Sequence, residues 1–139
     1  MLNAKDKKII EVLKENARMP IRDIAKKTAL RPSTVHLRLQ KMLEEGIIQK
    51  YTVKLDNAKI GENFIVFMLV NTEKDLGKVF LANPHIKEVF GITGEYDLML
   101  KLKFFDITEF NQFVLDLRKN ENIRKTLTMV VTAEVKEEL

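Results

Sequence analysis

The first residues that could do chemistry form a polar group between positions 31 and 41. They alternate with Val35, Leu39 and Met42, whose spacing is that of one helix face, and they carry hydroxyl, guanidinium, amide, imidazole and ammonium groups. Arginine pairs with guanine, glutamine with adenine, and serine or threonine with either base. A helix that buries its apolar face would therefore present a surface suited to duplex DNA. The alternative is an ordinary solvated helix face of similar composition.

Position along this helix predicts the role of each side chain. Residues near the start of a recognition helix enter the groove first, which favours Ser33, Thr34 and Arg38 as base contacts. Arg31 and Arg22 are expected to hold the flanking phosphate backbone. The complete set of candidate DNA-binding residues is Arg22, Arg31, Ser33, Thr34, His36, Arg38, Gln40, Lys41 and Lys50.

A second candidate is the tetrapeptide Gly94-Glu95-Tyr96-Asp97. It places two carboxylates and a phenol beside the exposed amides of a tight connection. An amino-acid ligand needs an anionic partner for its ammonium group, and amides or hydroxyls for its carboxylate. Taken alone, however, these residues favour a hairpin turn with solvated acids.

No catalytic or metal-binding set accompanies these candidates. The chain has no cysteine, and its two histidines, His36 and His85, fall in different halves, so a metal site within one chain is not expected. The five glycines include no phosphate-binding loop. We therefore expect neither enzymatic activity nor a cofactor. The lack of cysteine also fits the reducing cytoplasm.

Charge divides unevenly along the chain. Of the net charge of +4, residues 1–60 carry +7 and residues 61–139 carry −3. A basic half beside a mildly acidic half indicates that one half meets a polyanion while the other has a different task. The longest uncharged apolar run, about residues 63–72, is far shorter than the ~20 residues of a membrane helix, so no membrane association is expected.

Three helices are expected to position the polar group. Periodic apolar residues predict helices over residues 4–16, 20–28 and 32–45, with a cap for the first at Asn3. Three helices whose last two are joined by a very short turn form the helix-turn-helix pattern. Partly alternating apolar and polar residues over positions 47–55 predict a strand that follows the third helix, as a wing or a linker.

The second half of the chain alternates short strands with helices. Turn residues and apolar runs predict strands over residues 64–70, 86–93, 98–104 and 124–135, and helices over residues 75–83 and 106–118. This β-α-β-β-α-β order is the ferredoxin-like split arrangement, so the fold class is α+β. Two helices cover only one face of such a sheet, and we therefore expect dimerisation through the other.

These patterns divide the chain into three segments. Residues 1–50 are predicted to be the helix-turn-helix DNA-binding domain. Residues 51–62, which include Gly61, are predicted to be a linker strand or hinge. Residues 63–139 are predicted to bind an effector and to mediate oligomerisation.

Several short motifs together resemble one family over nearly the whole chain. They are Leu2-Asn3-Ala4-Lys5-Asp6, Leu13-Lys14-Glu15-Asn16-Ala17-Arg18, Asp23-Ile24-Ala25, Arg31-Pro32-Ser33-Thr34-Val35, Arg38-Leu39, Glu45-Gly46-Ile47-Ile48 followed by Tyr51, and Gly94-Glu95-Tyr96-Asp97. Each is weak alone, but the combination resembles the leucine-responsive regulatory protein/AsnC family, or feast/famine regulators. The resemblance implies a transcription regulator that binds double-stranded DNA as a homodimer or higher oligomer.

The resemblance also implies a small-molecule effector, often an amino acid, bound between sensor domains near Gly94, Glu95, Tyr96 and Asp97. Glu95 or Asp97 would contact the ammonium group. Thr126 and Thr128, on the predicted last strand, would contact the carboxylate if the fold brings them near.

Three positions depart from the family pattern. Ala29 and Arg31 stand where the family commonly has glycine and serine, and Leu43 stands where it usually has glutamate. Ala29 would make a left-handed turn less favourable by about 1 kcal/mol, and Arg31 removes a hydroxyl cap. These changes affect the start of the recognition helix and the DNA sequence that it reads.

Two other functions are compatible with the same architecture. Sirohaem decarboxylases resemble it, but an acidic tetrapyrrole requires a cationic cleft, whereas residues 61–139 are net acidic and contain a single histidine. A protein-binding scaffold is the other alternative, and the basic first half argues against it.

Overall fold

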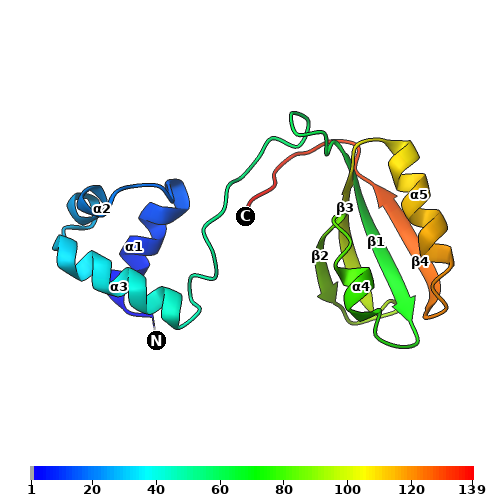
Figure 1. Ribbon diagram of the computed structural model, residues 1–139, viewed down its shortest axis with the longest axis horizontal. Coiled ribbons are helices and arrows are strands. Elements are labelled where there is room, and N and C mark those ends of the chain that lie inside the picture. The colour runs from blue at the N-terminus through cyan, green and yellow to red at the C-terminus, as the bar shows by residue number, and fades with distance from the viewer. Residues whose placement is uncertain (1) are drawn as a thin grey trace. The chain divides into compact units, whose positions relative to one another are not determined.

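The computed structural model describes residues 2–139 and divides them into two compact units (Figure 1). The N-terminal unit ends at Val53 and the C-terminal unit begins at Lys54. Each unit has its own cluster of buried apolar side chains. A hydrophobic core of its own is what an independently folding domain requires, and each unit has one.

Helix α1 (Ala4–Glu15) begins with a reciprocal cap that confirms the predicted role of Asn3. The Asn3 side chain accepts a hydrogen bond from the Asp6 amide at 2.9 Å, and the Asp6 carboxylate accepts one from the Asn3 amide at 3.1 Å. Two backbone donors that a helix leaves unpaired are thereby satisfied. The Asp6 side chain is fully buried, so its charge also needs a partner inside the protein.

Helices α2 (Ile21–Thr28) and α3 (Pro32–Glu44) are joined by a turn at Ala29, which has a φ of 57°. Of the residues described, only Ala29 adopts positive φ without being glycine. The strain expected from alanine at a position that favours glycine is therefore present. Arg31 is the N-cap of α3 and gives no side-chain cap, as the missing hydroxyl predicts. The buried core of the three helices consists of Ile9, Ile24, Ala25, Val35 and Met42.

The segment after α3 differs from the prediction. Gly46, with a φ of 73°, follows the end of the helix as expected, and the Ile48 amide donates to the Met42 carbonyl at 3.1 Å. The strand predicted over residues 47–55 was wrong, because this segment forms no strand in the described chain. Alternation alone does not make a strand, which requires a neighbouring strand for its hydrogen bonds. The described N-terminal unit therefore has no wing.

The C-terminal unit has the predicted β-α-β-β-α-β order. Its elements are β1 (Phe64–Thr72), α4 (Gly77–Leu81), β2 (Ile86–Gly91), β3 (Leu98–Phe104), α5 (Ile107–Arg118) and β4 (Ile123–Val130). The strands form an antiparallel sheet in the order β2-β3-β1-β4. Helix α4 is shorter than predicted, and β4 ends five residues before the predicted end at Val135.

One face of this sheet is closed by helices. Val66, Met68 and Val70 of β1 point to it, beside Leu100 and Leu102 of β3. Phe113 and Leu117 of α5, together with Phe104, complete the buried cluster. The aromatic rings interlock, with Phe104 and Phe113 meeting edge to face at a centroid distance of 5.4 Å.

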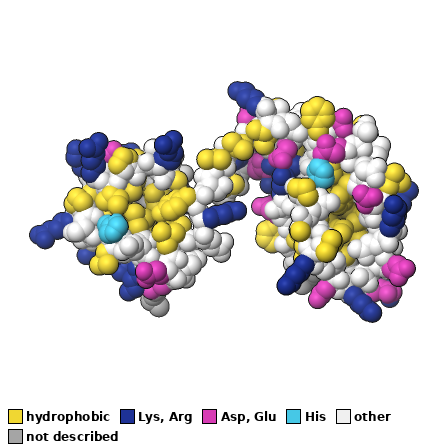
Figure 2. All heavy atoms as spheres, viewed as in Figure 1, with side chains coloured by type: hydrophobic (Ala, Val, Ile, Leu, Met, Phe, Trp, Pro, Cys, Tyr) yellow, Lys and Arg dark blue, Asp and Glu magenta, His cyan; other side chains and the backbone are white. Residues whose placement is uncertain are grey.

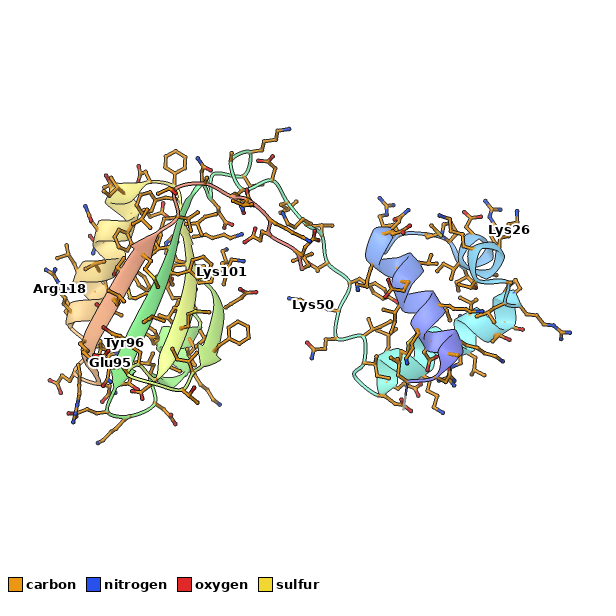
Figure 3. The ribbon with its side chains drawn as sticks, turned by 180° about the vertical axis from the view of Figure 1, so that it is seen from behind. Lys26, Lys50, Glu95, Tyr96, Lys101 and Arg118 are labelled. Carbon is orange, nitrogen blue, oxygen red and sulfur yellow. The ribbon has the colours of Figure 1, made fainter. Side chains whose placement is uncertain are left out.

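The opposite face is apolar and open, and Figure 3 turns it toward the viewer. Phe67 and Leu69 of β1 lie on it, paired in register with Met129 and Leu127 of β4. Phe90, Leu127 and Met129 remain 54%, 46% and 41% exposed. An apolar sheet face of this kind favours association with another molecule.

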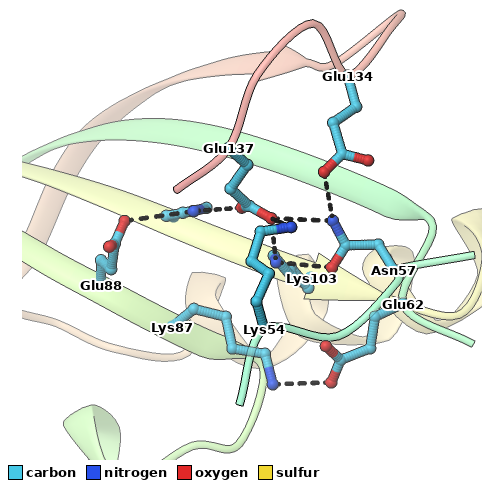
Figure 4. A network of polar contacts seen from close by, with 9 residues as sticks. Lys54, Asn57, Glu62, Lys87, Glu88, Lys103, Glu134 and Glu137 are labelled. Carbon is cyan, nitrogen blue, oxygen red and sulfur yellow. Dashed lines mark hydrogen bonds and ion pairs between the residues drawn. The ribbon is translucent and has the colours of Figure 1, made fainter. Parts of the chain in front are cut away.

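At one end of the open face, the C-terminal segment is held by an ionic network (Figure 4). The Glu137 carboxylate contacts Lys101 closely, lies 3.0 Å from the Lys103 Nζ and accepts a 3.0 Å hydrogen bond from Asn57. The hydrogen bond from Lys101, with those from Asn57 and Lys103, lowers the pKa of Glu137 to about 2. Asn57 is buried, and it also donates to Glu134 at 3.0 Å. The network ties residue 57 to the C-terminus of the same unit.

We predict that residues 54–139 fold alone and self-associate through the open sheet face. Sedimentation of this fragment should show a dimer or larger species, whereas a stable monomer would contradict the assignment. A fragment that begins at Glu62 lacks Asn57, so its Tm should be lower by about 5 °C. That comparison separates the folding contribution of the ionic network from the association of the sheets.

Candidate DNA-binding surface and effector region

Helix α3 presents its predicted polar residues on the side opposite its buried residues. Val35 and Met42 are fully buried, whereas Ser33, Gln40 and Lys41 are exposed. A helix turns 100° per residue, so Ser33 and Gln40 lie on nearly the same side. The remaining predicted contacts Arg22, Arg31, His36 and Lys50 are exposed, and Thr34 is half-buried.

Arg38 does not lie in this exposed stripe as a free side chain. Its Nε donates to Asp6 Oδ1 at 2.6 Å, and its Nη2 donates to Asp6 Oδ2 at 2.6 Å. The Asp6 side chain is 0% exposed and that of Arg38 is 16% exposed. These hydrogen bonds lower the pKa of Asp6, against the opposing effect of burial. The pair is bidentate, which is the strongest geometry available to arginine and carboxylate.

A base contact by Arg38, as predicted from the sequence, would require its guanidinium to leave this pair. Its guanidinium joins α3 to the first turn of α1, across 32 positions of sequence. We propose that Arg38 sets the orientation of α3 and leaves base contacts to its exposed neighbours. The pair was not predicted from the sequence because Asp6 was assigned only to the cap of the first helix. The position of Arg38 could have indicated it, since Arg38 lies four residues before the buried Met42 and therefore beside the buried face of the helix.

Basic side chains surround the helical unit. Figure 2 shows Lys and Arg side chains projecting around an apolar centre on the visible face of this unit. In Figure 3, Lys26 extends outward from α2, and Lys50 extends from the segment after α3. Both are exposed. Such a distribution suits contacts with phosphates on either side of a groove.

In the C-terminal unit, the turn at residues 94–97 is held by its own acids. The Glu95 carboxylate lies 2.6 Å from the Lys125 Nζ, and this hydrogen bond lowers the pKa of Glu95. The same ammonium group lies 5.0 Å from the centroid of the Tyr96 ring. Asp97 Oδ2 accepts a hydrogen bond from the Thr72 amide at 2.8 Å. Gly94 has a φ of 112°, which a side chain rarely adopts. The segment is the hairpin connection that the simpler interpretation predicted, but its two acids are engaged in contacts that hold the turn and are not simply solvated.

Thr126 and Thr128 face the helical side of the sheet, because they pair in register with Val70 and Met68. They line a cavity of about 380 Å³ between β4 and α5, together with Arg118 and Arg124. Lys125, which contacts the turn, points to the opposite face. The structure thus brings the turn and β4 together but does not place both sets in one pocket of a single chain.

Two guanidinium groups at this cavity were not predicted from the sequence. Arg124 pairs with Glu73 at 2.6 Å, whereas Arg118 has no such partner among residues 2–139. The cavity floor is apolar and includes Met68 and Leu117. Hydroxyls and a guanidinium above an apolar floor suit a ligand with a carboxylate and an apolar side chain.

Residues 2–139 contain no group of three or more side chains that could hold a metal ion. His36 is exposed in the N-terminal unit, and the half-buried His85 stacks on Phe104 in the C-terminal unit at a centroid distance of 4.7 Å. No helix in this range is long and apolar enough to cross a membrane.

A helix-turn-helix unit with a basic, polar recognition helix, joined to a βαββαβ unit with an open sheet face, defines a class of two-domain transcriptional regulators. The family model described as winged helix-turn-helix DNA-binding matches residues 2–49, and that described as Lrp/AsnC ligand binding domain matches residues 65–139. The chain belongs to the Lrp/AsnC family of transcriptional regulators. The relatives are regulators and not enzymes, so the sirohaem-decarboxylase alternative is set aside.

Similarity to individual proteins agrees with this assignment. The chain is 33% identical over 136 residues to the HTH-type transcriptional regulator FL11 of Pyrococcus furiosus, covering 95% of this chain and 90% of that protein. The transcriptional regulator NMB0573 of Neisseria meningitidis, solved as a complex with L-Met, has a TM-score of 0.88 and 28% identity, covering 99% and 94% of the two chains. The fold of E. coli AsnC is also similar, with a TM-score of 0.88 and 22% identity over 100% of this chain and 97% of that one.

We predict that Arg38→Ala lowers the Tm of the N-terminal unit by about 5 °C or more at pH 7, because it leaves the buried Asp6 carboxylate unpaired. The pair stabilises the wild type above the unfolded pKa of Asp6, and this stabilisation is lost as the pH falls through its depressed folded pKa. In the variant, protonation of Asp6 relieves the unpaired charge. The difference in Tm should therefore shrink as the pH falls below about 4.

Thermal unfolding followed by circular dichroism measures this effect, with Lys41→Ala as the matched control. Lys41 is exposed on the same helix, so its replacement should leave Tm unchanged. An Arg38→Ala protein with wild-type Tm, but with relaxed preference at one base of its DNA site, would restore the base-reading role.

Proposed function

We propose that this regulator binds duplex DNA as a dimer or higher oligomer, with one α3 helix in the major groove of each half-site. The observation that carries the proposal is the exposed polar side of α3, fixed in orientation by the Asp6–Arg38 pair. Ser33 and Gln40 would contact base edges, while Arg31, Arg22 and Lys50 would contact phosphates. Two copies related by two-fold symmetry would read half-sites about one helical turn apart.

The open sheet face supports the homo-oligomer. It exposes Phe90, Leu127 and Met129, which an identical face of a second copy would cover. A symmetric interface requires such a self-complementary patch. The charged side chains on this face lie toward its two ends and are paired there, Lys101 and Lys103 with Glu137 and Lys125 with Glu95, so two copies would bring together mainly apolar surface.

Binding to the selected DNA site is expected to weaken steeply with salt, since several Lys and Arg side chains displace counterions from DNA. Lys50→Ala should weaken all sequences about equally and reduce the salt slope by about 1. Gln40→Ala should weaken the specific site by ~1–3 kcal/mol and relax preference at one position per half-site. Lys119→Ala, an exposed change in the C-terminal unit, is the control.

These effects can be measured by titrating each variant against a library of sites at several salt concentrations. Affinity that does not change with salt would contradict a DNA-binding function. Identical losses for Gln40→Ala and Lys50→Ala across the library would show that base and phosphate contacts have been assigned wrongly.

We further propose that a small amino acid is the effector, bound between the C-terminal units of neighbouring copies. In support, the Neisseria relative was solved with L-Met, and Thr126 and Thr128 line a cavity that also has Arg118 at its border. In one copy these groups would contact the carboxylate, and Asp97 or Glu95 in the turn of a neighbouring copy would contact the ammonium group. To regulate DNA binding, the ligand must bind one oligomeric assembly more tightly than another, because equal affinity for both would leave the equilibrium between them unchanged.

Asp97→Asn tests this effector site with little structural disturbance, because it keeps an oxygen for the Thr72 amide and removes the charge. We expect the variant to bind the amino acid about 10- to 100-fold more weakly, with unchanged DNA binding in its absence. Calorimetry against the twenty amino acids identifies the ligand first. Thr132→Val, outside the cavity, is the control for Thr128→Val, which should also weaken binding. A ligand response that both Asp97→Asn and Thr128→Val leave intact would place the effector elsewhere.

A further inference from the structure

The exposed side of α3 has an apolar residue at its centre. Leu37 is 62% exposed, and it lies between Ser33 and Gln40 on the side of the helix opposite the buried Val35 and Met42. At 100° per residue, Ser33, Leu37 and Gln40 fall within about 60° of one another. Leu37 therefore contributes little to the core of its own unit.

Single exposed leucines are common and need no explanation by themselves. The position of Leu37 is informative because the N-terminal unit is basic, with 12 Lys and Arg against 6 Asp and Glu over residues 1–53, and so complements the charge of DNA. Leu37 lies within the polar surface that would meet the groove. Arg38, the only arginine within α3 itself, is engaged by Asp6. The usual partner of guanine is thus absent from the centre of this surface.

An aliphatic side chain in the major groove has one specific partner among the bases. Thymine alone carries a methyl group there, at C5, and apolar side chains distinguish it through that contact. Leu37 and Gln40 are separated by a rise of about 4.5 Å along the helix, which is close to the spacing of about 3.4 Å between base pairs. The two side chains can therefore reach neighbouring base pairs.

We infer that Leu37 is a specificity-determining residue that contacts the C5 methyl group of a thymine in each half-site, next to the base pair read by Gln40. This inference rests on the proposed DNA binding through α3. It predicts a half-site in which a thymine is selected for its methyl group and not only for hydrogen bonding.

Replacing thymine by deoxyuracil tests the contact, because it removes the methyl group and keeps every hydrogen-bonding group of the base. The site is first selected from random duplexes by the full-length protein. Each thymine of that site is then replaced in turn on either strand. For the wild type, one position per half-site should lose about fourfold in affinity, the factor for one methyl group removed from an apolar contact.

Leu37→Ala should bind the thymine site about fourfold more weakly per half-site and should no longer distinguish thymine from deoxyuracil at that position. Leu43→Ala is the matched control, since Leu43 is also exposed on α3 but lies about 120° away from Leu37. It should keep the wild-type sensitivity.

Each outcome has a distinct meaning. Selective loss of thymine discrimination in Leu37→Ala supports the inference. If no thymine is sensitive, or if Leu37→Ala and Leu43→Ala respond alike, Leu37 is not a base reader although DNA binding stands. If no site can be selected at all, the proposed DNA binding fails, and the contact fails with it.

Discussion

The buried ion pair between Asp6 and Arg38 is the interaction on which the DNA-binding unit depends. One carboxylate closes the cap of α1 and also accepts both hydrogen bonds of the Arg38 guanidinium. Because both side chains are largely buried, removing either one would leave an unpaired buried charge and lower the free energy of unfolding. The pair joins α3 to the first turn of α1, and in this arrangement Leu37 and Gln40 face outward. We propose that Arg38 acts by positioning these exposed side chains.

The C-terminal unit is governed by a different constraint, the unequal cover of its sheet. Helix α5 closes one face with Phe113 and Leu117, while Phe90 and Leu127 stay exposed on the other. In the proposed oligomer, a second copy would supply the missing cover and would also bring two recognition helices to one DNA site. An effector bound between such units could regulate DNA binding by favouring one assembly, without approaching α3.

The helices, the order of strands and helices along the chain, and the cap at Asn3 could be predicted from sequence because each depends on local periodicity or local hydrogen bonds. The pairing of Arg38 with Asp6 could not, because the two residues lie 32 positions apart and residue type alone favoured a contact with DNA. The strand at residues 47–55 failed for a related reason, since alternation does not supply a neighbouring strand. The direction of Thr126 depends on its register with Val70, which only the folded sheet reveals.

Because the chain has no cysteine, a single introduced cysteine can show directly whether the exposed side of α3 faces the DNA. A DNA-cleaving iron chelate can be attached to a single cysteine at Glu44, on the same side of α3 as Leu37, or at Glu11, which is exposed on α1. If α3 lies in the major groove, Glu44→Cys should cut the selected duplex in two clusters related by two-fold symmetry, about one helical turn apart, and Glu11→Cys should cut weakly. Strong cutting from Glu11→Cys with none from Glu44→Cys would contradict this placement of α3.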